Sequence, residues 1–343
     1  MSVVVSATGD ATSWGNPMRL ARRLFTPIAA LVVVVATAAS NASAFDYPSR
    51  PVQLIVGYAA GGPLDTGARL IAQELSKRLG QSFIVANHPG ASGIIATEEV
   101  VRARPDGYTL LACSSSNAWN ASLYDHLSFD FTRDLAPVAS YEIGGAVMEV
   151  SNSFPVKSIP EFITYAKANP GKINLASAGP GSAPGLYGEL FKALAGVDLI
   201  TVNYRGSAPA LPDLIAGRVQ VMFDPVITAI GPIKAGKLRG LGVTTAQPIE
   251  ALPDLPPIGE FVPGFEGTGF QGICAPKDTP TEIVSLLNKG VNAVLADPTI
   301  KTRLGDLGVD PFATSPAEFG KFIVGFTEKW AKVIRAAGLK GVP

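Results

Sequence analysis

A glycine-rich turn between a strand pattern and a helix pattern carries the clearest chemistry in this sequence. The hydrophobic run Val52–Gly57 leads into residues 58–62 (YAAGG), and helical spacing of apolar residues begins at Pro63. Paired glycines let the backbone adopt positive φ and approach a ligand closely. The first N–H groups of a helix have no acceptor inside the helix and lie at the positive end of its dipole. The turn therefore predicts an anion site built from backbone donors, although similar turns also serve as plain connections.

A second turn of the same design follows about 120 residues later. The strand pattern Ile173–Ser177 leads into residues 178–185 (AGPGSAPG), and a helix pattern follows. If each turn opens one α/β lobe, a cleft between the lobes has backbone donors on both walls, because ligands bind beyond the carboxyl ends of such strands. This arrangement predicts a two-lobed binding protein that closes on its ligand by a hinge motion.

Other polar residues at predicted strand ends have two interpretations each. The run Ser114–Asn117 either donates into a cleft or caps a turn locally. Asp224 accepts from a ligand or holds a neighbouring loop, and Arg205, beside Tyr204, pairs with a carboxylate or lies in solvent. Asp65, in the first turn of its helix, complements the helix dipole.

Enzyme motifs are absent from the sequence. Neither Ser92 nor Ser182 has the G-x-S-x-G surroundings of a hydrolase nucleophile. The glycine loops lack the Lys-Ser/Thr ending of a P-loop and do not match the dinucleotide fingerprint. His88 and His126 are the only histidines, and no His, Cys or carboxylate cluster has metal-ligand spacing. We therefore expect no catalytic residue, no metal and no cofactor.

The N-terminus is typical of a secretory signal peptide. Arg19, Arg22 and Arg23 precede an apolar run over 24–39, and the small residues 42–44 (ASA) form a cleavage pattern. We expect residues 1–44 to be cleaved on export by the general secretory route to the periplasm. A retained membrane anchor is the alternative, but the run is short for a span. The start codon is either Met1 or Met18.

The length of the chain after residue 44 suits two domains of ordinary size, and its charge excludes a nucleic-acid partner. Removing residues 1–44 leaves 28 − 3 = 25 basic and 28 − 1 = 27 acidic residues, a net charge near −2. This balance gives no basic excess for nucleic acid. The two cysteines, Cys113 and Cys274, are expected to be separate buried apolar residues, although export permits a disulfide.

Strand and helix patterns alternate along residues 45–343, which predicts an α/β fold with parallel sheets covered by helices on both faces. The expected strands are Val52–Gly57, Phe83–Ala86, Thr109–Cys113, Ile173–Ser177, Leu199–Asn203, Val219–Phe223 and Leu238–Thr244. The expected helices are Pro63–Leu79, Ile94–Ala103, Ile159–Ala168, Gly185–Ala195, Ala208–Ala216 and a C-terminal series from Thr281 that includes Pro316–Ala337.

Several segments in succession resemble one family, the substrate-binding receptors of tripartite tricarboxylate transporters (the Bug or TctC family). They are YPSRPVQLIVGYAAGG, NHPGASG, RPDGYTLL, YAKANPGKINLAS, YRGSAPALPDLIAGRVQVMFD and IKAGKLRGLGVTT, and together they cover the chain after residue 44.

The resemblance implies a type II periplasmic binding-protein fold with two doubly wound lobes. Lobe 1 would comprise residues 45–146 and 270–343, and lobe 2 residues 147–269. The implied ligand is a small organic, dicarboxylic or aromatic acid, and the implied partners are the membrane permease subunits, with the receptor itself a monomer. Together with Ser115 from the serine run, the implied ligand-binding residues are Tyr58, Ala60, Gly61, Gly62, Asp65, Ser177, Gly179, Gly181, Ser182, Tyr204 and Asp224.

This sequence departs from the family pattern at the first turn. Pro63 stands where the family usually has Ser or Thr, so one hydroxyl and one N–H donor are missing. Tyr58 adds a phenol, which favours a less polar or aromatic acid. Two other functions stay open at this point: a sensor for a two-component system, and a hydrolase or lyase acting on a carboxylated substrate.

Overall fold

The computed structural model describes residues 4, 6, 8–10 and 46–339 of the chain. The predicted signal peptide, including its apolar run and cleavage pattern, lies almost entirely outside these residues. Contacts divide the chain into Met1–Tyr47 and Pro48–Pro343, and the second unit contains every helix and strand considered below. Within the described part, no helix is both long enough and apolar enough to cross a membrane.

The first of two sheets has six strands in the order β11-β4-β10-β3-β1-β2. Strands β1, β2 and β3 are parallel, whereas β10 is antiparallel to both β3 and β4. Four strands of the sheet, β1 to β4, come from the N-terminal part of the chain, and two, β10 and β11, from its C-terminal part. The strands are β1 (Val52–Val56), β2 (Phe83–Asn87), β3 (Thr109–Ser114), β4 (Leu135–Gly144), β10 (Gly269–Pro276) and β11 (Asp310–Pro311).

The second sheet has five strands in the order β7-β6-β8-β5-β9. Its strands β6, β7 and β8 are parallel, and β5 is antiparallel to β8 and β9. We call the first sheet with its helices lobe 1 and the second sheet with its helices lobe 2. The strands of lobe 2 are β5 (Ala146–Ser151), β6 (Asn174–Ser177), β7 (Ile200–Asn203), β8 (Val221–Pro225) and β9 (Leu238–Val243).

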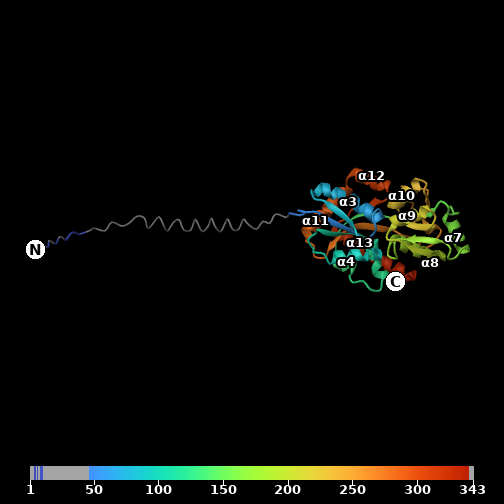
Figure 1. The fold of residues 1–343 in the computed structure, drawn as a ribbon, viewed down its shortest axis with the longest axis horizontal. Helices are drawn as coiled ribbons and strands as arrows, with labels where there is room; N and C mark the ends of the chain where they lie inside the picture. Colours follow the sequence, from blue (N-terminus) through green and yellow to red (C-terminus); the bar gives the residue numbers. More distant parts are fainter. Residues whose placement is uncertain (1–3, 5, 7, 11–45, 340–343) are drawn as a thin grey trace. The chain divides into compact units, whose positions relative to one another are not determined.

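Helices follow most of the parallel strands, and their starts are marked in the sequence. Ser158, Ser182 and Ser315 each cap a helix by accepting a backbone N–H bond, as expected for N-cap serines. In Figure 1 the orange α11 lies near the blue α3 in lobe 1, whereas the red end of the chain after α13 lies beside α8, and Trp330 of α13 packs against Tyr187 of α8 with ring centroids 5.8 Å apart. The helices are α3 (Pro63–Leu79), α4 (Ile94–Val101), α5 (Ser115–Leu123), α6 (Phe131–Asp134), α7 (Ile159–Ala168), α8 (Ala183–Ala195), α9 (Ser207–Ile215), α10 (Val226–Lys234), α11 (Thr281–Leu295), α12 (Pro298–Asp306) and α13 (Pro316–Ala336), with short 3₁₀ turns η2 (Ala91–Gly93) and η3 (Ile258–Glu260).

Two segments of the chain connect the lobes. The chain leaves lobe 1 at Gly145, between β4 and β5, and returns between β9 and β10. The hydroxyl of Thr244 joins the two segments, because it accepts from the N–H of Ala146 at 2.8 Å and donates to the carbonyl of Gly267 at 2.6 Å. A single threonine thus holds both crossings together.

The α/β fold with two lobes is confirmed, but the expectation of parallel sheets holds for only part of each sheet, because both sheets are mixed. The antiparallel strands β4, β5 and β10 are buried at nearly every position, so they lack the alternation that marks a half-exposed strand. All three also lie at the lobe crossings, outside the strand–helix repeat on which the prediction depended.

The expectation that the two cysteines are separate, unbonded residues is wrong. Cys113 on β3 and Cys274 on β10 form a disulfide, with a Cα–Cα distance of 5.8 Å and a sequence separation of 161 residues. Both residues are buried, as expected, but neither is a free thiol. The pairing of β3 with β10 brings them together, and no local pattern of residues predicted β10.

Candidate functional site

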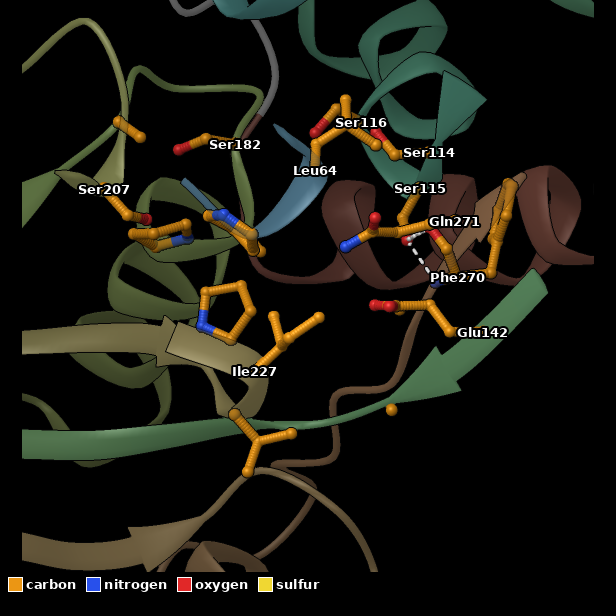
Figure 2. Close-up of a pocket in the computed structure, with 18 of the residues that line it drawn as sticks. Leu64, Ser114, Ser115, Ser116, Glu142, Ser182, Ser207, Ile227, Phe270 and Gln271 are labelled. Atoms are coloured by element: carbon orange, nitrogen blue, oxygen red, sulfur yellow. Dashed lines mark hydrogen bonds between the residues drawn. The ribbon is translucent and has the colours of Figure 1, made fainter. Parts of the chain in front are cut away.

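The starts of five helices meet at one cavity. The volume of this cavity, counted as the space that the centre of a water molecule can occupy, is about 80 Å³. Lobe 1 contributes the first residues of α3 and α5, and lobe 2 those of α8, α9 and α10 (Figure 2). The lining residues from these starts are Pro63, Leu64, Ser115, Ser116, Ala183, Pro184, Ser207, Val226 and Ile227.

The helix starts make the cavity favourable for an anion. The first N–H groups of each helix have no intrahelical acceptor, and the positive ends of the dipoles add to one another. Hydroxyl donors line the same space, from Ser114, Ser115, Ser116, Ser182 and Ser207. No Lys, Arg or His is among the lining residues in the described part of the chain. An anion in this cavity would therefore be held by dipoles and hydroxyls instead of by an ion pair.

The predicted residues of the first turn differ in whether they line the cavity. Tyr58 lines the cavity, and its hydroxyl donates to Ser116 Oγ at 2.9 Å and to the Ser92 carbonyl at 3.1 Å. Burial raises the pKa of Tyr58 well above its usual value, so the phenol stays neutral. Ala60, Gly61 and Gly62 do not line the cavity.

Asp65 lies behind the first turn rather than in the cavity. Its carboxylate accepts from Gly61 N–H at 2.8 Å, from Arg69 Nε at 2.9 Å and from Asn87 Nδ2 at 2.9 Å. Burial alone would raise the pKa of Asp65, but the hydrogen bonds from Arg69, Gly61 and Asn87 hold it below its usual value. Asp65 thus shapes the turn and takes up one of its donors.

Of the ligand-binding residues predicted in and before the second turn, only Ser182 lines the cavity. Ser182 accepts from the N–H of Gly185 at 3.1 Å and donates to the carbonyl of Gly179 at 2.5 Å. Ser177 accepts from the N–H of Gly179 at 3.0 Å and does not line the cavity. The turn is therefore tied together by two serine hydroxyls.

Gly181 joins the second turn to lobe 1. Its N–H donates to Ser92 Oγ at 3.1 Å, and its carbonyl accepts from the indole N–H of Trp119. Ser92 has φ 53°, in the left-handed region that is uncommon for serine. On the other side of the cleft, Ala59 N–H donates to the Arg205 carbonyl at 3.1 Å. Hydrogen bonds therefore join the two lobes at both glycine-rich turns.

Of the remaining predicted residues, Ser115 lines the cavity and Tyr204 and Asp224 do not. Ser115 Oγ accepts from the N–H of Phe270 at 2.7 Å, the dashed bond in Figure 2. Tyr204 donates to Asp213 at 2.8 Å. Asp224 is fully buried on β8, where burial raises its pKa to about 6 while the hydroxyls of Ser207 and Thr228 oppose the increase.

Sequence reasoning missed three polar side chains of the cavity wall. Glu142 on β4, Tyr187 on α8 and Gln271 on β10 all line the space, and each is at least nine-tenths buried. Glu142 and Gln271 stand on strands that the sequence patterns did not predict. Tyr187 occupies a core position of its helix, where an aromatic residue normally indicates packing, and it packs edge-on against Trp119 with ring centroids 6.0 Å apart.

No cluster of three or more His, Cys, Asp or Glu side chains that could hold a metal ion occurs among the described residues.

Comparison with known proteins assigns this architecture to a family. Residues 67–339 match the family described as "Tripartite tricarboxylate transporter family receptor". The structure of Rpa4515 from R. palustris with adipate is similar to this chain at 37% identity and a TM-score of 0.83, covering 85% of this chain and 99% of that one. The structure of the periplasmic binding protein BugD shows 35% identity to this chain and a TM-score of 0.83. The match covers 86% of this chain and 100% of BugD.

A third solved structure, MatC from Rhodopseudomonas palustris with bound malate, shows 32% identity and a TM-score of 0.81, with 84% of this chain and 100% of that chain covered. The match of the family over most of the chain and the shared two-lobed fold establish a solute-binding receptor instead of an enzyme. The chain belongs to the tripartite tricarboxylate transporter family receptors.

Proposed function

We propose that this receptor binds a small carboxylated solute in the cavity between its lobes and presents it to the permease of a tripartite transporter in the membrane. The observation that carries the proposal is the meeting of five helix starts at a cavity whose described lining contains no cationic side chain. Backbone N–H groups and serine hydroxyls suit a carboxylate, which accepts several hydrogen bonds at once. The relatives solved with adipate and with malate support the same ligand class.

The proposal gives the predicted residues distinct roles. Tyr58, Ser115 and Ser182 would contact the ligand directly, because they line the cavity. The other nine predicted residues would act by shaping the turns and by holding the lobes together. Residues 45–146 with 270–343 would close on residues 147–269, and the crossings joined by Thr244 would act as the hinge. Residues 1–44 would direct the chain to the periplasm and be removed there.

The decisive experiment is thermal unfolding of the purified mature chain with a panel of mono-, di- and tricarboxylates and aromatic acids. A ligand at 100 times its dissociation constant should raise the free energy of unfolding by roughly 2.7 kcal/mol. Sodium chloride at matched ionic strength is the control for screening. If no acid stabilises the protein beyond the salt control, the proposed function is wrong.

Delivery to a permease needs a separate test in cells. A strain that lacks this receptor should lose uptake of the radiolabelled acid selected by the unfolding experiment, and plasmid-borne receptor should restore it. Uptake that persists at the original rate without the receptor would contradict the transport role while leaving the binding role intact.

A further inference from the structure

Glu142 is a buried carboxyl group in the cavity wall with no partner of its own. Figure 2 shows its side chain and that of Gln271 projecting into the cavity from the same wall. Glu142 is 5% exposed. Its Oε2 atom is buried and has no hydrogen-bond partner among the described residues. An unpaired buried carboxyl costs stability, so its presence in a binding cavity points to a partner supplied by the ligand.

In the part of the chain that the structure describes, no cationic side chain lines the cavity at this carboxyl group. On β4 its neighbour is the phenol of Tyr141, and on β10 its register partner is Gln271. On α3 the charged residues Asp65 and Arg69 pair with each other at 2.9 Å. On β11, Asp310 pairs with Ile143 in the register and is exposed. The other ionisable groups of the cavity lining are the phenols of Tyr58 and Tyr187.

Gln271 presents a donor beside Glu142. The Oε1 atom of Gln271 accepts from the Tyr141 hydroxyl at 3.0 Å, which fixes the orientation of the amide. The Nε2 group then remains available to donate into the cavity. The wall formed by Glu142 and Gln271 lies away from the serine-capped start of α8, so a ligand that spans the cavity meets donors at both ends.

Building on the proposed function, we infer that Glu142 is a specificity-determining residue. In its protonated form its carboxyl donates a hydrogen bond to a second carboxylate of the ligand, next to the Gln271 amide, while the first carboxylate lies at the helix starts. The receptor would then select short dicarboxylic acids over monocarboxylic and amino acids.

The charge of the cavity requires the protonated form. An ionised Glu142 would repel a dianionic ligand in a space where no cation balances the two. A neutral carboxyl group presents one O–H donor to the ligand oxygen. Burial by itself raises the pKa of Glu142 to about 8, so the group is already largely neutral at pH 7. Its proton is lost as the pH rises above that value, and the affinity for a dicarboxylate should fall with it.

Two sets of matched ligands test the inference in the mature chain. Adipate, hexanoate and 6-aminohexanoate share a six-carbon length, and succinate, butyrate and 4-aminobutyrate share a four-carbon length. Within a set, only the group at one end changes from carboxylate to methyl or to ammonium. Calorimetric titration should give the dicarboxylate of at least one set an affinity ten times or more above that of its two analogues.

Two substitutions of Glu142 test whether its protonated or its ionised form binds the ligand. Glu142→Gln keeps an N–H donor, so it should bind the preferred dicarboxylate within about threefold of wild type at pH 7. Glu142→Leu removes the donor and should reduce dicarboxylate binding to the level of the monocarboxylate. Retained monocarboxylate binding by Glu142→Leu serves as the control for an intact fold. Wild-type affinity should fall roughly tenfold between pH 7 and pH 9, whereas that of Glu142→Gln should stay constant.

Several results would overturn the inference. Preference for the amino acid, with loss of binding in Glu142→Gln, would mean that an ionised Glu142 pairs with an ammonium group. Equal dicarboxylate affinity in wild type and Glu142→Leu would mean that Glu142 does not contact the ligand. Failure of all six compounds to stabilise the wild-type protein, together with failure of the wider acid panel, would instead contradict the proposed function itself.

Discussion

The carboxylate of Asp65 accepts a hydrogen bond from the N–H of Gly61 at 2.8 Å, within the turn that opens lobe 1. The donor that glycine chemistry suggests for a ligand is therefore already used inside the protein. The N–H of Gly62 is also occupied, by a longer bond of 3.4 Å to the Ala59 carbonyl. The donors left for a ligand lie beyond Pro63, at the start of α3. We therefore propose that the glycines position the helix start instead of binding the anion themselves.

Asp65→Ala should destabilise the fold by about 2 kcal/mol, because it leaves the N–H of Gly61 and the amide of Asn87 without their acceptor. The pKa of Asp65 is lower in the folded than in the unfolded state. Its stabilisation is thus present at neutral pH, above the unfolded pKa of about 4, and is lost as the pH falls through the folded pKa. Urea unfolding at pH 7 and at pH 2.5 measures the difference. Asp106→Ala, which removes a partly exposed ion pair with Arg50, is the control and should change stability less.

Gly61→Val should weaken ligand binding in a protein that still folds. Gly61 has φ 79°, and an added Cβ would lie 3.6 Å from Ala208 Cβ across the cleft. The extra methyl groups of valine would press on lobe 2 and oppose closure. Gly264→Val is a matched control, since Gly264 has φ 84° and open space around it. Both variants should lose about 1–2 kcal/mol of stability, and only Gly61→Val should lose acid binding in calorimetry. Equal affinity in the two variants would contradict a role in closure.

Ser92→Ala should favour the open receptor. The substitution removes the acceptor for the Gly181 N–H and so deletes one contact between the lobes. A loss of about 1 kcal/mol from the closed state corresponds to roughly fivefold weaker binding of the acid that the panel selects. Ser76→Ala deletes a comparable bond within lobe 1, from the N–H of Phe83 at 2.8 Å. That control should lower thermal stability while leaving affinity unchanged, and a parallel loss of affinity in both would argue against a lobe contact.

Glu142 should make the ligand-free protein less stable as the pH rises. Its pKa is about 8 in the folded state against an ordinary value of 4.5. The folded state therefore holds the proton over a range where the unfolded chain has lost it. The contribution of Glu142 to stability should be highest below pH 4.5 and fall between pH 5 and pH 8, by roughly 1.4 kcal/mol per pH unit at most. Urea unfolding of wild type and Glu142→Gln across this range measures the slope, and identical slopes would show an ordinary pKa.

The strand–helix repeat could be predicted because local patterns determine it. Pro63–Leu79 and Ile159–Ala168 form helices with the predicted bounds, and all seven predicted strands exist with shifts of one or two residues. The missed strands depend on long-range pairing, whereas the helices α5 and α10, which were also missed, are local elements. β4, β5 and β10 are buried strands whose neighbours come from distant parts of the chain, so no short window of sequence marks them. The disulfide depends on one of these strands and was missed for the same reason.

The residues of the candidate site show the same contrast between local patterns and long-range pairing. Tyr58, Ser115 and Ser182 follow strands, where the rule for α/β sheets predicts ligand contacts, and they do line the cavity. Glu142 and Gln271 could not be identified, because their importance comes from the pairing of β4 with β10. The glycines were assigned as direct donors, although the acceptor provided by Asp65 four residues later is visible only in three dimensions.

The disulfide between Cys113 and Cys274 has a consequence for the integrity of the chain. The whole of lobe 2 and both crossings lie between these two residues. A protease that cuts a loop of lobe 2 would produce two fragments that remain covalently joined inside lobe 1. The nicked receptor would keep both halves of the cavity wall on one molecule until a reductant reached the bond. The inserted lobe is thus the part of this receptor that can be cut without the molecule coming apart.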